Sequence, residues 1–457
     1  MPAARPPAVD FPTLQQRIEE AGVVGMGGGG FPTHRKLRPR LHTVIINGAE
    51  CEPLLATDRH LLANHLDEVV AGAGAVARAC GAAEVALAVK AKHADLAARL
   101  APTADGVPLR LATLPDIYPS GDEFFVIRDV AGRVLPQRTI PADAGYFVGN
   151  AATFKAIHDA LRGVPLTRRF VTVGGAVARP VTVEAAIGTP FRELAAAAGG
   201  ATAPDARFLE GGVLMGALTD LDAPVTKTTA ALIALPADHP AILERTRPLH
   251  YSVKIAEHIC CQCRKCTELC SRYLIGHDIE PHKLMRLIGS ARDYRDLHSD
   301  TVFHCSGCGL CSLVACPFDL SPRRLIMESR RNFPRPAAPA GDPVERADAE
   351  LFTVPTRRLI HHLRLDAYDR PAEFAGRLPV PVELRLPLRQ HAGVPAEPAV
   401  RAGQRVAAGQ AVGRAPAGAP GAHVHTPAAG TVVRADDVVV IATIPPRARR
   451  SREGDIA

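Results

Sequence analysis

The sequence predicts a multidomain α/β protein in which four folded regions follow one another along the chain. Its 457 residues are more than a single hydrophobic core usually organises. Strand-like apolar runs alternate with helical patterns over the first third of the chain. Nine of the eleven cysteines fall between Cys260 and Cys316, which in a cytoplasmic chain points to bound metal rather than to disulfides.

Composition excludes several classes of protein. Hydrophobic residues make up 47% and charged residues 22%, which argues against wholesale disorder. Aromatic residues are only 4% and Trp is absent, so we expect no nucleic-acid partner. The net charge of +7 is spread along the chain, apart from an arginine cluster at 447–452 that we interpret as solvated. Since neither a long apolar run nor a signal peptide occurs, we expect no transmembrane segment and a cytoplasmic location.

Residues 1–166 are expected to form an α/β domain. Apolar runs typical of buried strands alternate with segments that carry helical patterns. The expected strands are Thr43–Asn47, Glu84–Lys90 and Val107–Leu111, and the expected helices are Leu14–Ala21, His60–Ala79, His93–Leu100 and Phe147–Leu161. This alternation predicts a parallel sheet covered on both faces.

The pattern changes after this domain. Residues 167–240 combine short β-like runs with one helix over Thr189–Ala198, for which Thr189 is the expected N-cap. Residues 245–332 are cysteine-rich and mostly helical in pattern. A linker is expected over 333–376, since its first part is rich in Pro and Ala. Short strands punctuated by glycine predict a small β-barrel or sandwich over 377–445.

The cysteines form two ferredoxin-like sets, C-x2-C-x2-C-x3-C and C-x2-C-x2-C-x4-C. In two-cluster ferredoxins the fourth cysteine of each set ligates the other cluster. We therefore predict two [4Fe–4S] clusters, one held by Cys260, Cys263, Cys266 and Cys316 and the other by Cys305, Cys308, Cys311 and Cys270. Structural zinc is the alternative, although its ligands usually come as two separated pairs. Cys261 is left over, and we interpret it as a buried free thiol.

A glycine-rich loop, Gly25–Gly30, contains G-x-G-x-x-G, but a helix-like segment precedes it and Pro32 follows it. This context is wrong for the usual dinucleotide fingerprint. Consecutive glycines nevertheless leave backbone N–H groups open to a phosphate or a flat ring, with a flexible loop as the alternative. A polar turn over 47–53 follows a predicted strand, where open α/β sheets place ligands, and further polar turns occupy 118–123 and 149–153.

These segments together resemble a known family. GMGGGGFPTHRKL, NGAECEP, YPSGDE and GNAAT, in this order, are similar to the flavin domain shared by RnfC and the NADH-binding subunit of respiratory complex I. The resemblance implies a Rossmann-like domain that binds FMN, with NADH stacking on the flavin. It places Phe31 and Glu52 near the nicotinamide nucleotide, and Ala49 departs from the Asp of the complex I subunit. The implied flavin-site residues are Gly27, Gly28, Gly30, Lys36, Asn47, Glu50, Tyr118, Gly121, Asp122, Glu123 and Asn150.

The resemblance continues through nearly the whole chain. Residues 167–240 resemble the β-grasp (SLBB) module that follows the flavin domain in this family. Two cluster motifs, where the complex I subunit has one, favour the RnfC side. Residues 377–445 are similar to the barrel-sandwich domain that RnfC carries at its N-terminus. No lysine follows Lys283, so this barrel cannot carry biotin or lipoate.

A C-terminal barrel and a short chain resemble the PduS family of cobalamin reductases from propanediol-utilisation microcompartments. This implies an enzyme that passes electrons from NADH through FMN and two [4Fe–4S] clusters to cobalamin or a corrinoid-carrying protein. It also implies a microcompartment location, with a shell protein or an adenosyltransferase as a further partner. The residues themselves show no corrinoid site, because D-x-H-x-x-G is absent. We expect no catalytic side chain, because hydride transfer belongs to the cofactors.

Two alternatives stay open. An RnfC-like peripheral electron-transfer subunit of a membrane complex would share every cofactor motif and would differ only in its partner. A non-enzymatic scaffold or ligand-binding module would be built on the β-grasp and barrel regions alone.

Overall fold

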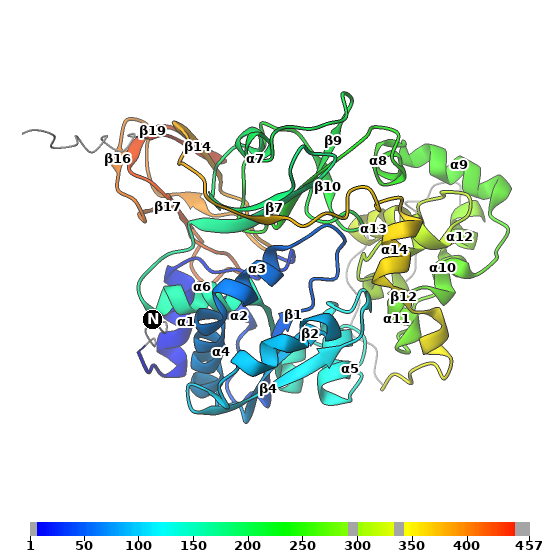
Figure 1. Ribbon diagram of the computed structural model, residues 1–457, viewed down its shortest axis with the longest axis horizontal. Coiled ribbons are helices and arrows are strands. Elements are labelled where there is room, and N and C mark those ends of the chain that lie inside the picture. Colours follow the sequence, from blue (N-terminus) through cyan, green and yellow to red (C-terminus); the bar gives the residue numbers. More distant parts are fainter. Residues whose placement is uncertain (1–6, 291–299, 333–341, 444–457) are drawn as a thin grey trace, which may run out of the picture.

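The computed structural model describes residues 7–290, 300–332 and 342–443 (Figure 1). An N-terminal domain, blue to cyan, lies below a second sheet that is coloured green. The cysteine region, green to yellow, and the C-terminal β region, orange, lie at opposite ends of the molecule. The predicted multidomain α/β class is confirmed.

The N-terminal domain is built on a five-stranded sheet of order β3-β4-β2-β1-β6, in which only the edge strand β3 is antiparallel to its neighbour. Val44 and Ile46 pack into the core on one face of the sheet and Ile45 into the core on the other, as expected for a parallel sheet buried on both sides. The strands are β1 Thr43–Gly48, β2 Glu84–Lys90, β3 Thr103–Ala104, β4 Val107–Leu114 and β6 Tyr146–Asn150.

Helices cover both faces of this sheet. On one face, α4 and α6 pack together, with α1 and α3 beside them, and on the other face α5 buries Phe125 and Ile127. The N-terminal helix places Leu14 and Ile18 in the core rather than on the surface. The helices are α1 Phe11–Glu20, α2 Thr33–Lys36, α3 Thr57–Asn64, α4 Leu66–Cys80, α5 Glu123–Ala131 and α6 Ala151–Leu161, with 3-10 turns η1 Ala91–Arg99 and η2 Pro141–Ala144.

Three expected helices differ from the structure. The segment 147–150 is strand, because β6 pairs in parallel with β1, and α6 begins at Ala151 with Asn150 as its side-chain cap. The expected helix His60–Ala79 is two helices that break at His65, whose backbone is not helical. The expected helix His93–Leu100 is a 3-10 segment with a kink at His93. Short apolar runs do not distinguish helix from strand, so pairing with neighbouring strands decides.

A six-stranded sheet forms the α+β module, in the order β10-β9-β11-β7-β8-β13. Its helix α7, Phe191–Ala197, begins after Pro190, so the expectation of Thr189 as N-cap is wrong. The reason is that the Thr189 carbonyl accepts from Val225 N–H at 2.8 Å, which holds Thr189 in an extended connection. The strands are β7 Arg168–Gly175, β8 Val181–Ala186, β9 Arg207–Glu210, β10 Ala217–Thr219, β11 Ala231–Leu235 and β13 Glu373–Arg377.

The expected linker 333–376 is wrong over the part that the structure describes. Its backbone supplies partners to strands that would otherwise have free edges: β12, Val354–Pro355, pairs with β5, Ile117–Tyr118, and β13 pairs with β8. Leu359 and Leu365 are buried. Between these strands lie η6 Ala349–Phe352 and α14 Thr356–His362. Residues 333–341 lie outside the described residues.

The cysteine region is helical, as predicted. It contains α8 Pro240–Thr246, α9 Leu249–Ile259, α10 Lys265–Glu268, α11 Ser271–Leu274, α12 Pro281–Ser290, η4 Asp300–His304, η5 Cys311–Ala315 and α13 Pro322–Asn332. In the described part of the chain, no helix has the length and apolar character needed to cross a membrane.

The C-terminal β region consists of two small antiparallel sheets, the arrangement of a sandwich. Their orders are β14-β20-β19-β16 and β15-β17-β18. The strands are β14 Glu383–Pro387, β15 Glu397–Pro398, β16 Arg405–Val406, β17 Ala411–Arg414, β18 Val424–His425, β19 Gly430–Ala435 and β20 Val438–Thr443. The arginine cluster at 447–452 lies outside the described residues.

Candidate functional site

The glycine loop Gly25–Gly30 is a turn closed by its own backbone. The N–H of Gly30 donates to the carbonyl of Gly25 at 3.0 Å, and the N–H of Gly25 donates to the carbonyl of Phe31 at 2.8 Å. Gly28 has a φ of +100°, which side chains rarely tolerate. A Cβ built on Gly28 or Gly29 would meet no described atom within 4 Å. The outer face of the loop is therefore open at Gly28 and Gly29. The N–H groups of Gly25, Met26 and Gly30 are used within the protein, so those of Gly27, Gly28 and Gly29 are the ones left for a phosphate or a flat ring.

The loop meets the carboxyl ends of two parallel strands. Asn47 and Asn150 are register partners at the ends of β1 and β6. The Nδ2 of Asn47 donates to the carbonyl of Gly121 at 3.0 Å. A Cβ on Gly27 would lie 3.3 Å from Asn150 Cβ. The polar turns over 47–53, 118–123 and 149–153 are thus brought together with the glycine loop at one edge of the sheet, where α/β folds bind ligands.

Two partly buried carboxyl groups, those of Glu50 and Asp58, lie beside Asn150. The Nδ2 of Asn150 donates to both carboxylate oxygens of Asp58 at 2.9 Å, and Glu50 Oε1 accepts from the N–H of Asp58 at 2.8 Å. Burial, followed by the charge of Asp58, raises the pKa of Glu50 to about 7. Burial also raises the pKa of Asp58 to about 6. Both carboxyl groups are therefore harder to ionise than free carboxyl groups.

Arg169 also belongs to this site, although no sequence pattern marks it apart from its neighbour Arg168. It reaches the glycine loop from β7 of the α+β module. Its Nη2 donates to the carbonyl of Met26 at 3.2 Å and its Nε to the carbonyl of Thr229 at 3.0 Å. Burial lowers the pKa of Arg169 to about 10, so it stays charged and offsets the nearby Asp58.

Other site residues from the sequence analysis lie around the same edge. Lys36 forms an ion pair with Glu123 and donates to the carbonyl of Val148 at 2.8 Å. Phe31, next to the glycine loop, keeps 43% of its surface exposed. The hydroxyl of Ser120 is buried and has no hydrogen-bond partner among the described residues. An unpartnered hydroxyl, open backbone N–H groups and a cation fit the phosphate and ring of the implied FMN.

Asp122 and Tyr118 connect this site to the cysteine region. Asp122 caps α5 and accepts from Arg272 Nη2 at 2.8 Å. The hydroxyl of Tyr118 donates to the carbonyl of Cys308 at 2.6 Å and lies 3.4 Å from Glu52 Oε1. Tyr118 is 2% exposed, so these contacts are shielded from water.

Glu52 connects the site to the α+β module. Its two carboxylate oxygens accept from the N–H groups of Leu214 and Met215 at 3.0 and 2.8 Å. A Cβ on Gly212 would lie 2.2 Å from Glu52 Cδ, so any side chain there would displace the Glu52 carboxylate from its hydrogen bonds. Burial is the largest influence on Glu52 and raises its pKa. Both oxygens are engaged by the protein, which fixes the carboxylate in one orientation.

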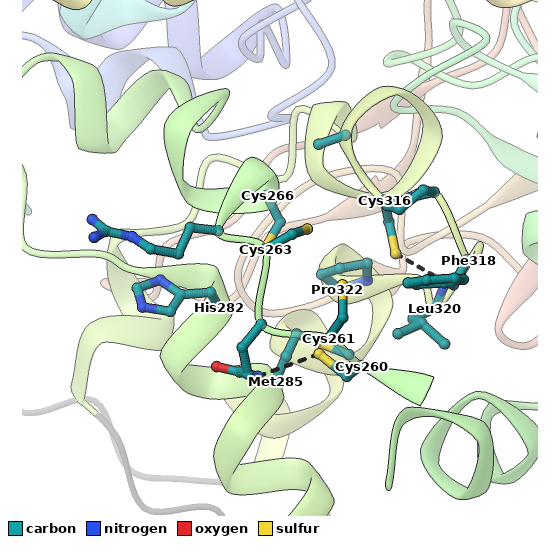
Figure 2. Close-up of a pocket in the computed structure, with 14 residues that line it drawn as sticks. Cys260, Cys261, Cys263, Cys266, His282, Met285, Cys316, Phe318, Leu320 and Pro322 are labelled. Atoms are coloured by element: carbon teal, nitrogen blue, oxygen red, sulfur yellow. Dashed lines mark hydrogen bonds between the residues drawn. The ribbon is translucent and has the colours of Figure 1, made fainter. Parts of the chain in front are cut away.

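Two hollows in the cysteine region are lined by the two predicted cysteine sets. One, of about 360 Å³ including its open part, is lined by Cys260, Cys263, Cys266 and Cys316 (Figure 2). The other, of about 310 Å³, is lined by Cys270, Cys305, Cys308 and Cys311. We call the second the proximal hollow, since Tyr118 of the N-terminal domain contacts Cys308, and the first the distal hollow. Each hollow collects three cysteines of one motif and the fourth cysteine of the other.

The thiols in each hollow lie close enough to influence one another. Burial, followed by the other three sulfurs of the distal hollow, raises the pKa of Cys266 to about 12. Burial and the sulfurs of Cys308 and Cys305 raise the pKa of Cys270. Bare thiolates are therefore unfavourable here, whereas four thiolates around iron fit a [4Fe–4S] cluster. Within the described ranges, no three His, Cys, Asp or Glu side chains are placed to hold a single metal ion.

Cys261 is exposed, so the expectation of a buried thiol is wrong. It follows the end of α9 in an irregular segment where Gln262 and Arg264 have left-handed φ values of 55° and 65°. The chain winds around the distal hollow at the surface, so Cys261 both lines the hollow and is exposed to solvent.

Four family models match the chain, one for each folded region. The Nuo51 FMN-binding domain matches residues 18–159, the SLBB domain 170–218, the 4Fe-4S dicluster domain 259–321 and the RnfC barrel sandwich hybrid domain 372–444. These matches confirm the predicted series of flavin, β-grasp, ferredoxin-type and barrel-sandwich regions. The chain is thus a flavin and iron–sulfur oxidoreductase, with an FMN-binding domain and a domain for two [4Fe–4S] clusters.

The chain is similar to curated relatives over different lengths. Cobalamin reductase PduS of Salmonella typhimurium is 40% identical over 92% of this chain and 94% of the relative. The PduS of Citrobacter freundii is 39% identical over 93% of this chain and 94% of the relative. One component of the ion-translocating oxidoreductase complex of Pseudomonas aeruginosa is 37% identical, over 58% of this chain and 34% of that component. Because the first two similarities span nearly the whole of both chains, the protein belongs to the PduS family of cobalamin reductases.

Proposed function

We propose that this protein passes electrons from NADH, through FMN and two [4Fe–4S] clusters, to the cobalt of a corrinoid. One observation carries the proposal. Each of two hollows is lined by three cysteines of one motif and the fourth cysteine of the other, and a hydrogen bond from Tyr118 joins the proximal hollow to the sheet edge where the glycine loop lies. When bound, FMN accepts hydride from NADH and the clusters carry single electrons. One NADH would thus supply the electrons for two equivalents of cob(III)alamin to become cob(II)alamin.

The glycine loop and its neighbours would hold the flavin. The N–H groups of the loop and Lys36 would face the phosphate, and Asn47, Glu50 and Asn150 would contact the ring system. The exposed ring of Phe31 is available for stacking on the nicotinamide nucleotide. Both carboxylate oxygens of Glu52 accept backbone hydrogen bonds, so Glu52 would form a fixed wall of the nucleotide site. The full proposed set is Gly27, Gly28, Gly30, Phe31, Lys36, Asn47, Glu50, Glu52, Tyr118, Gly121, Asp122, Glu123 and Asn150.

Buried contacts would hold the proximal cluster at a fixed distance from the flavin. The Tyr118 hydroxyl grips the carbonyl of Cys308, and Arg272 forms an ion pair with Asp122. Both contacts are sheltered, so they resist the fluctuations that loosen surface ion pairs. Cys305, Cys308, Cys311 and Cys270 are the proposed ligands there.

The distal cluster would deliver the electrons. Its proposed ligands are Cys260, Cys263, Cys266 and Cys316, and the hollow opens to solvent. Cys263 is exposed, and the neighbouring ring of Phe318 is 41% exposed. An acceptor at the surface can approach this cluster more closely than the proximal one, where Cys308 and Cys311 are buried.

The test is anaerobic NADH oxidation with cob(III)alamin as acceptor, followed by the visible spectrum of flavin, clusters and corrinoid. We expect the flavin and cluster bands to bleach on addition of NADH and the corrinoid to be reduced catalytically. Bleaching without corrinoid reduction would leave the electron route intact and favour an RnfC-like partner complex. Absence of bleaching in a protein loaded with FMN and iron would contradict the proposed route.

We further propose that the protein works in a propanediol-utilisation type microcompartment, beside a shell protein or an adenosyltransferase. The near full-length similarity to PduS supports this assignment. Copurification with intact microcompartments is the expected result, and a protein found instead with the membrane fraction would contradict it.

A further inference from the structure

Arg323 lies at the junction of the two hollows. It is the second residue of α13 and lines the proximal hollow with the four cysteines, whereas the preceding Pro322 lines the distal hollow. The N–H of Arg323 donates to Ser312 Oγ at 3.0 Å, which ties the start of α13 to η5. The first turn of α13 is therefore anchored between the two proposed clusters.

A loop of the α+β module positions the side chain of Arg323. Its Nη2 donates to the carbonyl of Met215 at 3.3 Å. The N–H of the same Met215 holds Glu52 of the N-terminal domain. Met215 therefore joins the two sites, because its N–H binds the Glu52 carboxylate and its carbonyl binds the Arg323 guanidinium.

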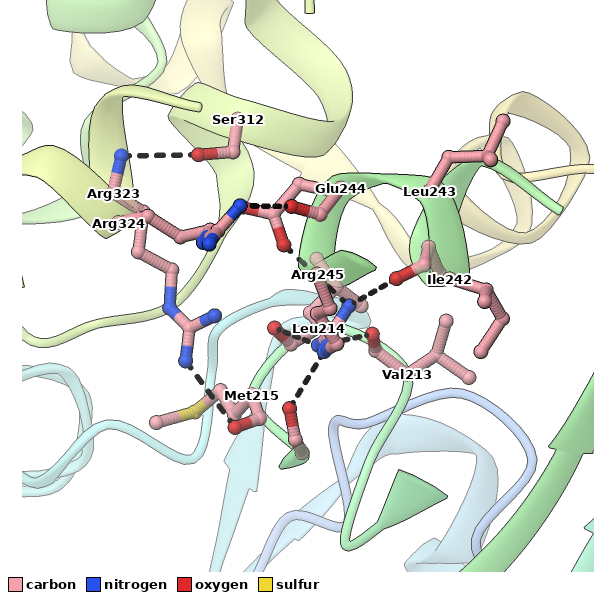
Figure 3. A network of polar contacts seen from close by, with 12 residues as sticks. Val213, Leu214, Met215, Ile242, Leu243, Glu244, Arg245, Ser312, Arg323 and Arg324 are labelled. Carbon is pink, nitrogen blue, oxygen red and sulfur yellow. Dashed lines mark hydrogen bonds and ion pairs between the residues drawn. The ribbon is translucent and has the colours of Figure 1, made fainter. Parts of the chain in front are cut away.

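This loop is itself clamped by Arg245 (Figure 3). Arg245 is buried, with 7% of its side chain exposed. Its guanidinium donates to the carbonyls of Val213 and Leu214 at 2.9 Å and of Gly216 at 2.8 Å. Three hydrogen bonds from one rigid fork leave the loop little freedom, so Arg323 is held on a fixed support.

The guanidinium of Arg323 has one N–H donor that no described residue accepts. Its Nε is buried and has no hydrogen-bond partner among the described residues. That nitrogen would lie 4.0 Å from a Cβ built on Gly307, which stands between the ligands Cys305 and Cys308. A cation in this position stabilises negative charge on the sulfurs.

We propose that Arg323 raises the reduction potential of the proximal [4Fe–4S] cluster, and so favours electron transfer out of the flavin. The proposal rests on the cluster ligation given under the proposed function. Reduction adds one negative charge to the cluster, and a neighbouring cation stabilises the reduced form more than the oxidised form. The effect acts on the potential, not on the presence of the cluster.

The experiment is a mediated redox titration with a chemical reductant, followed by EPR of the reduced clusters. We expect Arg323→Gln to lower the equilibrium constant for reduction of one cluster by about tenfold, which is about 59 mV for one electron. Arg323→Lys should keep most of the wild-type potential, because it keeps the charge. Arg324→Gln is the matched control, since its guanidinium donates instead to the carbonyls of Glu244 and Arg247 at 2.6 and 2.8 Å.

Each outcome separates the hypotheses. An unchanged potential in Arg323→Gln, or an equal shift in Arg324→Gln, would overturn the tuning role. Loss of iron in Arg323→Gln would also overturn it and make Arg323 an assembly residue. Absence of any cluster signal in the reconstituted wild type would count against the proposed function instead, because neither NADH nor a corrinoid enters this titration.

Discussion

Replacement of Cys270 or Cys316 by alanine tests the crossed ligand sets directly. Each is the fourth cysteine of its own motif, yet each lines the hollow of the other motif. We expect Cys270→Ala to abolish the proximal cluster and Cys316→Ala to abolish the distal cluster. If each motif bound its own cluster, the two outcomes would be exchanged.

The expected size of the effect follows from the ligand count. Each hollow offers one set of four proposed ligands, so each variant should fall from about eight to about four iron atoms per chain. Reduction by NADH then distinguishes the variants. Cys316→Ala keeps the proximal cluster, next to Tyr118, and should still show an NADH-reduced cluster signal. Cys270→Ala keeps only the distal cluster, which dithionite should reduce but NADH should reduce slowly.

The assay measures the iron content of each variant and records the EPR signal of its clusters after reduction by NADH or by dithionite. Cys261→Ala is the matched control, because Cys261 lines the distal hollow but belongs to neither proposed set. It should keep about eight iron atoms. The crossed arrangement is refuted if Cys316→Ala loses the NADH-reduced signal while Cys270→Ala retains it.

Three further predictions concern the contacts between domains. Gly212→Ala places a methyl group 2.2 Å from Glu52 Cδ and should lower the free energy of unfolding by about 1–3 kcal/mol in urea denaturation; no loss would mean that the loop moves freely. Arg169→Met removes the hydrogen bonds from the guanidinium to the carbonyls of Met26 and Thr229 and should weaken FMN binding about tenfold, as measured by fluorescence titration. An equal loss of affinity in Arg168→Met would contradict this role. Burial lowers the pKa of Lys227 from 10.5 to about 7 in the folded protein. Between pH 7 and pH 10.5 the Lys227 amine therefore carries a proton in the unfolded chain but not in the folded one, so the free energy of unfolding should rise with pH across this range. Lys227→Met should remove this rise in a pH series of urea denaturations.

Much of the fold could be predicted from local pattern. The runs TVIIN and EVALAVK become the central strands β1 and β2, because strands buried on both faces of a parallel sheet are apolar without alternation. The spacing of the cysteines likewise predicts which thiols share a hollow. Pattern failed over 147–150 and in the expected linker, where strand pairing with distant residues decides the structure.

The sequence by itself determined the order of the four regions, the cysteine sets and the glycine loop, because these features depend on neighbours in the chain. Only the tertiary structure decided that Arg169 supports the glycine loop and that Arg323 faces the proximal hollow. It also decided that Glu52 is held by the backbone of Leu214, 162 residues further along the chain. Contacts of this kind join single residues across domains and repeat with no period. They therefore leave no trace in composition or spacing, and they exist only once the domains pack together.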